Sequence, residues 1–421
     1  MVIILTMINI LFSFFYTKKV KTIANPCLIL SVLWIIILLF YNIFCNDVLG
    51  QLDTITYFVV LSGLLLFQIG VISQYCWGKK RTKIPLDDRN FNYKTLRYLT
   101  FFNIIIYFIY LHRLRLLVNK EFREYRIFER IKLIHGYRSE GFGIINNFLL
   151  YLTVFWIFLF ILLILHKVKF NKYIFINFLM GTVYFILVGK RLALIVPILS
   201  VTFAKILTYR LKIGEIRKVL GMVGVLFSLS MFYFFFLHKR FSNLETSGIT
   251  AIIPYFGMPL KNLDTVIKEE LYKNDFFFPN FLRLFYAIST KLLNSNIHVH
   301  NIIKDYLTVG NFTSNIYTTY FTMLEDFGYK GVILFQFLLG NIFGYIFKNR
   351  KKIVYFTLYC IWLEVLLLQY AQDSFFPFFS TRLQQIIYIL LLNKLLLKKI
   401  KRKNKWKFYI LVINFMVMRM R

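Results

Sequence analysis

Two adjacent cations, Lys190 and Arg191, follow Gly189 between two apolar stretches, 173–188 and 192–207. Each stretch is close to the length that crosses a bilayer. A charged side chain at such a place costs up to about 3 kcal/mol unless an anionic group faces it. A guanidinium can hold a phosphate through two parallel hydrogen bonds. We therefore expect Arg191, supported by Lys190, to bind an anionic, lipid-linked substrate; the alternative is that Arg191 extends toward lipid headgroups.

Three other arginines have surroundings that suit the same chemistry. Lys239 and Arg240 follow another apolar stretch and repeat the arrangement at Arg191. Arg138 lies in a glycine-rich segment, which lets a backbone approach a ligand closely. Arg283 lies in a later segment rich in aromatic residues, which we expect either to pack on the membrane domain or to form an interfacial or sugar-stacking surface.

Three residues are candidates for moving or accepting a proton: His298, His300 and Asp326. The sequence does not choose among them. The two histidines have no third ligand at a suitable spacing, so we expect no metal site. Asp326 has a structural alternative, because it precedes an apolar stretch whose helical N-terminus it could cap.

The composition indicates a multi-pass membrane protein. Hydrophobic residues make up 58% of the 421 residues and aromatic residues 19%, with a mean hydropathy of +0.63. A helix needs roughly 20 apolar residues to cross a bilayer, and on this criterion we predict about eleven spans. The spans run from about residue 2 to 16, 27 to 45, 55 to 77, 97 to 118, 147 to 165, 173 to 188, 192 to 208, 219 to 237, 329 to 347, 353 to 370 and 382 to 397.

Short loops rich in Lys and Arg are retained on the cytoplasmic side of a membrane. The basic clusters are at 18–21, 79–83, 166–169, 209–218, 348–352 and 398–407. Each follows an odd-numbered predicted span, which places the N-terminus outside and the basic C-terminal segment 398–421 inside. The net charge of +33 then reflects this asymmetry and attraction to anionic lipid, with no nucleic-acid partner expected.

The same topology leaves two large external loops, at about 112–146 and 238–327, on one integral membrane domain spanning 1–421. The cytoplasmic loops are too short for a nucleotide-binding domain, and the sequence contains no Walker-type loop. We therefore expect the chemistry on the outer face.

The segment 315–331, NIYTTYFTMLEDFGYKG, runs into a predicted span that contains Gly340 and Gly344. This pattern resembles bacterial O-antigen and capsule polymerases, the Wzy-type oligosaccharide repeat-unit polymerases. The Gly189-Lys190-Arg191 turn resembles the Gly-x-Arg of the same group, and the large loop between the two features adds to the likeness. The two glycines themselves predict close helix packing.

The resemblance implies an all-α, GT-C-like membrane glycosyltransferase of the bacterial cytoplasmic (inner) membrane, without cofactor or metal. It would polymerise undecaprenyl-pyrophosphate-linked oligosaccharide repeat units into O-antigen, capsular or exopolysaccharide chains. Arg191 and Arg240 would hold the pyrophosphate, with Arg138 as a counterpart in the first loop. Implied partners are the lipid-linked donor and acceptor, the bilayer, a repeat-unit flippase and a chain-length regulator.

Two other functions fit the sequence. An O-antigen ligase-like enzyme would share the donor but move finished glycan to another acceptor. A transporter or flippase of lipid-linked sugar would place charged groups within its spans, where the sequence offers mainly Glu364 and Gln369.

Overall fold

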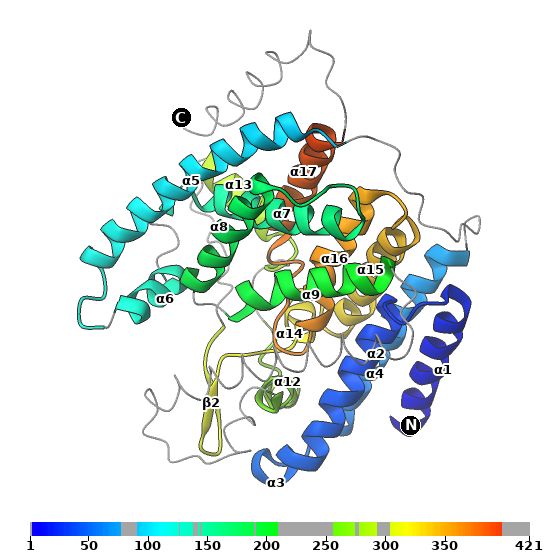
Figure 1. The fold of residues 1–421 in the computed structure, drawn as a ribbon. Coiled ribbons are helices and arrows are strands. Elements are labelled where there is room, and N and C mark those ends of the chain that lie inside the picture. The colour runs from blue at the N-terminus through cyan, green and yellow to red at the C-terminus, as the bar shows by residue number, and fades with distance from the viewer. Residues whose placement is uncertain are drawn as a thin grey trace. The chain divides into compact units, whose positions relative to one another are not determined.

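The structure is a computed structural model that describes residues 2–76, 91–125, 127–137, 142–143, 145–188, 191–208, 256–273, 278–292 and 304–397. It is mostly helical (Figure 1). Its contacts divide the chain into two compact units. Unit 1 comprises Met1–Ile84 and Ile198–Gln384, and unit 2 comprises Pro85–Pro197 and Gln385–Arg421.

The elements of the described residues follow in chain order. They are α1 (Val2–Val20), α2 (Pro26–Phe40), a π-helical turn η1 (Tyr41–Cys45), α3 (Asn46–Leu49), α4 (Thr54–Cys76), α5 (Tyr93–Lys120), α6 (Ile127–Tyr137), α7 (Ile145–Ile164), α8 (Lys172–Val188), α9 (Arg191–Thr208), α12 (Met258–Lys268), α13 (Arg283–Leu292), β1 (Leu307–Val309), β2 (Phe312–Ser314), α14 (Thr319–Phe327), α15 (Tyr329–Lys348), α16 (Ile353–Leu367) and α17 (Phe379–Leu396).

The helices confirm a multi-pass, helical membrane protein. Each predicted apolar stretch coincides with a helix except 219–237, which lies outside the described residues, as does the basic segment 398–421. Six helices in the described part are long and apolar enough to cross a membrane: α1, α2 with its continuation to Leu49, α4, α5, α7 and α15. Shorter apolar helices occur at Val196–Thr208 and Ile353–Leu367.

Helices α4 and α15 form the core of unit 1, and glycines allow their backbones to touch. A Cβ at Gly340 would overlap the backbone carbonyl of Phe67, and one at Gly344 would lie 2.8 Å from the carbonyl oxygen of Val71. Close packing at these two glycines is therefore confirmed. Asn341 adds a polar contact, because its side-chain oxygen accepts from Gln74 at 2.7 Å.

The C-terminal ends of α1, α4 and α15 meet at one end of unit 1. The Tyr16 ring of α1 contacts Tyr75 of α4 and Phe347 of α15, with centroids 5.8 and 6.5 Å apart. The clusters 18–21 and 348–352 therefore lie at the same end, as the predicted topology requires. Helices α3 and α12 and the β-hairpin lie at the other end (Figure 1).

Asp264 of α12 fixes this second end to the start of α4. Its buried carboxylate accepts from the Asp53 N–H at 2.7 Å and the Thr56 hydroxyl at 2.8 Å. Lys261 and Lys268 each approach it at 3.0 Å. The N-terminus of a helix is the positive end of its dipole, so the negative charge of Asp264 stabilises the start of α4.

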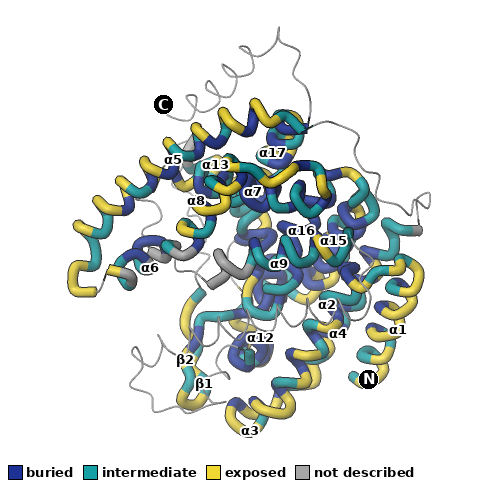
Figure 2. The backbone as a smooth tube through the Cα atoms, viewed as in Figure 1, coloured by how far each residue is buried: buried dark blue, intermediate teal, exposed yellow. Residues whose placement is uncertain are grey.

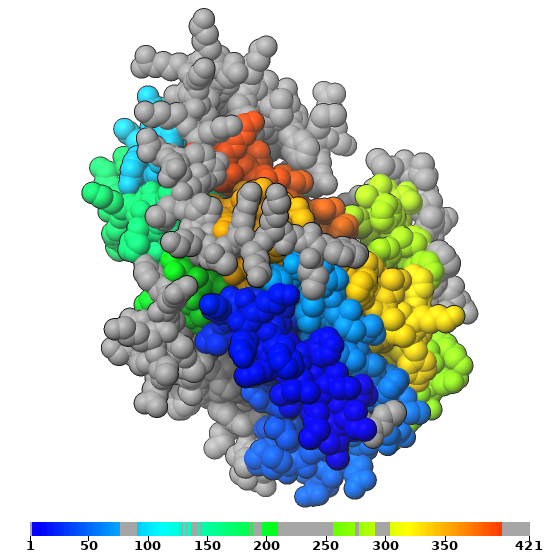
Figure 3. Space-filling model, turned by 90° about the vertical axis from the view of Figure 1, so that its right-hand side faces the viewer, coloured from blue at the N-terminus to red at the C-terminus, as the bar shows by residue number. Residues whose placement is uncertain are grey.

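Helix α1 exposes apolar side chains along most of its length (Figures 2 and 3). Ile3, Ile4, Met7 and Phe15 are each more than half exposed. Such a surface is unfavourable in water and favourable against lipid chains.

Candidate functional site

Most of the residues predicted for the site lie outside what the structure describes. Those residues are Arg138, Lys190, Lys239, Arg240, His298 and His300. Arg191 is the first residue of α9, but its side chain is not described. Asp326 and Arg283 are described, and both belong to unit 1. The predicted roles of the other residues stay predictions.

Asp326 lies in the last turn of α14 and is buried. Its carboxylate accepts from the Asn280 N–H at 2.9 Å, the Asn280 side-chain amide at 3.1 Å and the Phe281 N–H at 2.9 Å. The alternative that Asp326 caps the next apolar helix is wrong, because the N-cap of α15 is Gly328 and no side chain bonds there. The carboxylate instead holds the turn that leads into α13.

The protonation of Asp326 is balanced between two opposing effects. Burial raises the pKa of Asp326 to about 6, although the hydrogen bonds from Asn280 and Phe281 favour the charged form. The group therefore remains mostly ionised at pH 7 and can take up a proton under mildly acidic conditions.

A second buried carboxylate, Asp373, contacts the same helix one turn earlier. The Thr322 hydroxyl of α14 donates to Asp373 at 2.7 Å, and the Phe375 N–H donates to it at 2.8 Å. Thr322 and Asp326 are four residues apart and thus lie on one face of α14. On this face, Asp326 contributes its own carboxylate and Thr322 contacts the carboxylate of Asp373 in the interior of unit 1.

A buried ion pair joins α16 to α17. The Arg382 guanidinium lies 2.6 Å from the Glu364 carboxylate and also donates to the Ser374 carbonyl at 3.0 Å. Arg382 is 4% exposed, whereas the Glu364 side chain is 17% exposed, so the pair is buried on the Arg382 side only. The sequence reasoning recognised Glu364 but missed Arg382. The pairing could have been predicted, because an acidic residue within a membrane span is usually paired with a cation and Arg382 begins the next apolar stretch.

We call Thr322, Asp326, Glu364, Gln369, Asp373 and Arg382 the polar layer. It lies toward the end of unit 1 opposite the basic clusters. Helix α16 has 15 residues and its neighbour α15 has 20. The chain turns back between α15 and α16, so α16 runs toward the level at which α15 begins. Because α16 is five residues shorter and each residue rises 1.5 Å, it ends about 8 Å before that level.

The chain between α16 and α17 is not helical, and it packs at this depth. The Thr319 N–H donates to the Gln369 carbonyl at 2.8 Å, and Gln336 of α15 donates to the Gln369 side chain at 3.3 Å. Irregular backbone at membrane depth is tolerated only where protein covers it or where it lines an aqueous space. The polar layer is therefore a place where polar chemistry is possible inside an apolar bundle.

Glu325 and Lys304 form an ion pair next to the polar layer. Their side chains approach to 2.5 Å, and the Glu325 carboxylate also accepts from Asn280 at 3.0 Å. Lys304 lies 5.3 Å from the centre of the Phe321 ring. The segment before the β-hairpin is thus tied to α14 by charge.

Arg283, predicted to bind substrate, is the first residue of α13 and is half-buried. Burial lowers its pKa, but an arginine remains charged at any physiological pH. Its position directly after the turn held by Asp326 brings these two predicted site residues into one region.

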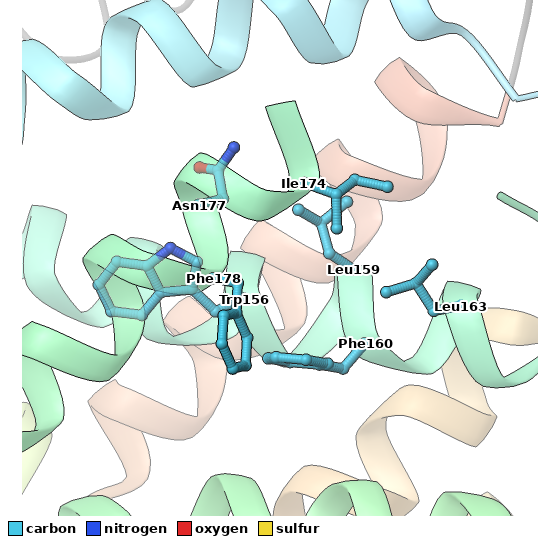
Figure 4. Close-up of a pocket in the computed structure, with 7 residues that line it drawn as sticks. All are labelled: Trp156, Leu159, Phe160, Leu163, Ile174, Asn177 and Phe178. Carbon is cyan, nitrogen blue, oxygen red and sulfur yellow. The ribbon is translucent and has the colours of Figure 1, made fainter. Parts of the chain in front are cut away.

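An apolar pocket in unit 2 lies between α7 and α8 and does not resemble a catalytic site (Figure 4). Six of its seven lining residues are apolar; the seventh is Asn177. The Asn177 amide donates to Thr100 at 2.7 Å and accepts from Asn103 at 3.1 Å, so it is already engaged. Phe178 on the pocket wall is 43% exposed, which suits a surface covered by lipid.

No protein-family model matches the chain, and no match is found among curated proteins or solved structures.

Proposed function

We propose that this protein is a membrane glycosyltransferase that joins oligosaccharide repeat units carried on undecaprenyl pyrophosphate, at the outer face of the bacterial cytoplasmic membrane. The observation that supports this most is the location of the segment 315–331. This segment, which carries the likeness to the repeat-unit polymerases, forms α14 and the start of α15 and borders the polar layer. It lies toward the end of unit 1 opposite the basic clusters.

The arginines supply the donor site in this proposal. Arg191 and Arg240 hold the pyrophosphate, while Arg138, Lys190, Lys239 and Arg283 bind the rest of the substrate. The bond from the sugar to the pyrophosphate breaks, and negative charge builds on the departing group. Cations placed to meet that charge are the largest help such a site can give.

The acceptor sugar needs a group that takes the proton of its attacking hydroxyl. Asp326, His298 and His300 are the candidates, and Asp326 is the one whose surroundings are described. Its three hydrogen bonds use three of the roughly four lone-pair positions of a carboxylate, which leaves space for one more donor. An ionised Asp326 can therefore accept a hydroxyl proton without releasing Asn280 and Phe281.

The finer parts of the proposal come from the resemblance. They are a GT-C-like arrangement of about eleven spans, a partner flippase that delivers repeat units, and a partner that regulates chain length. A ligase-like transfer of finished glycan uses the same donor site and differs only in its acceptor.

Transport of the lipid-linked sugar is a second candidate, and one observation favours it. Glu364 and Arg382 form a charged pair beside a break between helices, which is the arrangement that transporters use near the midplane. The Arg382 guanidinium, however, also holds the Ser374 carbonyl, so the pair has a structural task in closing the turn before α17.

The proposal is tested by glycan length in cells from which the gene is deleted and then restored. We expect single repeat units after deletion, a full ladder with the wild type, and no ladder with membrane-resident Arg191→Ala. Arg97→Ala, in the first half of α5, is the control for loss of a cation and should restore the ladder. Long but unattached chains after deletion would indicate a ligase, and repeat units retained on the cytoplasmic leaflet would indicate a transporter.

A further inference from the structure

Helix α13 and the residue that leads into it expose an apolar stripe formed by Phe281, Phe285 and Ile288. Their exposed fractions are 38%, 59% and 44%. Phe285 and Ile288 are three residues apart in α13 and therefore lie on one side of the helix, while Phe281 lies in the turn directly before it. Arg283 lies two positions before Phe285 in the same helix and therefore on its opposite side.

The start of this stripe is fixed against α15. The Phe281 ring packs against Phe335 of α15 and Phe376, with centroids 5.2 and 5.9 Å apart. Its backbone N–H is held by Asp326 at 2.9 Å. The depth of Phe281 relative to α15 is therefore defined by contacts on its ring and its backbone.

This depth corresponds to the boundary between headgroups and acyl chains. Helix α15 begins at Tyr329, which is 43% exposed, and exposed tyrosines are typical of a membrane interface. Phe335 lies six residues further along, which is about 9 Å into the membrane. An interfacial amphipathic helix buries its apolar face about 5–10 Å into this boundary.

The surface next to the stripe is one that lipid must already cover. Ile333 and Leu334 of α15 are 51% and 44% exposed on a helix able to cross a membrane. They are adjacent in sequence to Phe335, against which Phe281 packs. The stripe of α13 therefore begins at a residue that packs against the neighbour in sequence of these lipid-facing side chains.

We infer that α13 is an interfacial membrane-binding helix, with Phe281, Phe285 and Ile288 inserted among the acyl chains of the outer leaflet. The side that carries Arg283 and Tyr286 then faces away from the acyl chains. This places Arg283 at the level of lipid phosphates. The inference does not depend on the protein's enzymatic activity, because it follows from burial and depth alone.

The test is photocrosslinking to lipid, using p-benzoylphenylalanine introduced singly into the full chain in nanodiscs of phosphatidylethanolamine and phosphatidylglycerol. The positions are Phe285 on the stripe, Tyr286 on the other side of α13, Ile333 on α15 and Thr313 in the β-hairpin. Mass spectrometry of the irradiated protein reports lipid adducts. We expect adducts at Phe285 and Ile333, and at most one-tenth of that yield at Tyr286 and Thr313.

Two results would overturn the inference. Failure of Phe285 to form lipid adducts while Ile333 does so would show that another part of the protein covers the stripe. Equal adduct yields at Phe285 and Tyr286 would show that α13 is surrounded by lipid and does not lie in the interface. Because both positions carry aromatic residues on the same helix, they control for each other's effect on folding.

Discussion

Asp326 holds Asn280 by two hydrogen bonds, one to the Asn280 backbone N–H at 2.9 Å and one to its side-chain amide at 3.1 Å. The two residues are 46 positions apart in the chain. This contact joins α14 to the turn before α13. Asp326 therefore has a structural task, which is to hold the turn that leads into α13.

Asp326 should make the stability of the protein depend on pH in a particular direction. Its pKa of about 6 in the folded state lies above the value of about 3.9 of a free aspartate. The folded state therefore binds the proton more tightly, and this contribution to stability is lost as pH rises through 6. The apparent Tm of wild type minus that of Asp326→Asn should increase as pH falls from about 7.5 to 5.

Asp264 is the matched control, because its pKa is shifted the other way. Burial raises this pKa, but the Asp53 N–H, Lys268, Lys261 and Thr56 outweigh burial and lower it overall. Its contribution is present at neutral pH and is lost as pH falls through the folded pKa. The Tm difference between wild type and Asp264→Asn should therefore stay constant between about pH 7.5 and 5 and shrink only below about pH 4. A Tm difference that grows between about pH 7.5 and 5 for Asp264→Asn, or does not grow for Asp326→Asn, would contradict the assignments.

Removing one partner of the Glu364–Arg382 pair should destabilise the folded protein. Arg382→Met leaves the partly exposed Glu364 carboxylate without its partner, and about 3–5 kcal/mol, the cost for a fully buried pair, is the upper limit of the loss. We expect a marked fall in Tm, measured by fluorescence-detected size-exclusion chromatography. The double variant Glu364→Gln with Arg382→Met should recover part of the loss; no recovery would mean that the Ser374 contact of Arg382 dominates.

Gly340 should tolerate no side chain, because a Cβ there would overlap the backbone carbonyl of Phe67. Gly340→Ala forces α4 and α15 apart, and overpacking of this kind typically costs about 1–3 kcal/mol. The yield of folded protein in detergent should fall. Leu338→Ala, on the exposed side of the same helix, should have little effect. Equal behaviour of the two variants would argue against glycine packing at this interface.

The orientation of the chain can be read from labelling by a maleimide that does not cross membranes. Thr313→Cys in the β-hairpin should react in intact spheroplasts, whereas Lys351→Cys in the basic cluster should react only after permeabilisation. The reverse pattern would place the polar layer on the cytoplasmic side, where a flipped lipid-linked substrate does not reach it.

The sequence predicted where the helices of unit 1 lie but not how the chain passes between them. Apolar length alone located α4 and α15, and the spacing of Gly340 and Gly344 predicted their contact. The early end of α16 and the burial of α14 were not predicted. Both depend on tertiary partners, such as the Gln369 carbonyl that accepts from the Thr319 N–H, and a single sequence does not show partners so far apart.

The site was predicted only in part, for a similar reason. The acidic residue before Phe327-Gly328 identified Asp326, because its type and place were visible in the sequence. Its contact with Asn280 was not visible, since nothing marks an asparagine in an aromatic loop as the partner of a distant carboxylate. Arg382 was counted as the start of an apolar helix and its pairing with Glu364 was missed.

The central claim is tested most directly with purified protein in liposomes, supplied with lipid-linked repeat units extracted from cells that lack the gene. We predict that the wild type converts single units into a ladder of polymers without any nucleotide sugar, and that Arg191→Ala leaves single units. Polymers in neither sample, under conditions in which the wild type moves the lipid-linked units between leaflets, would contradict a polymerase and identify a transporter.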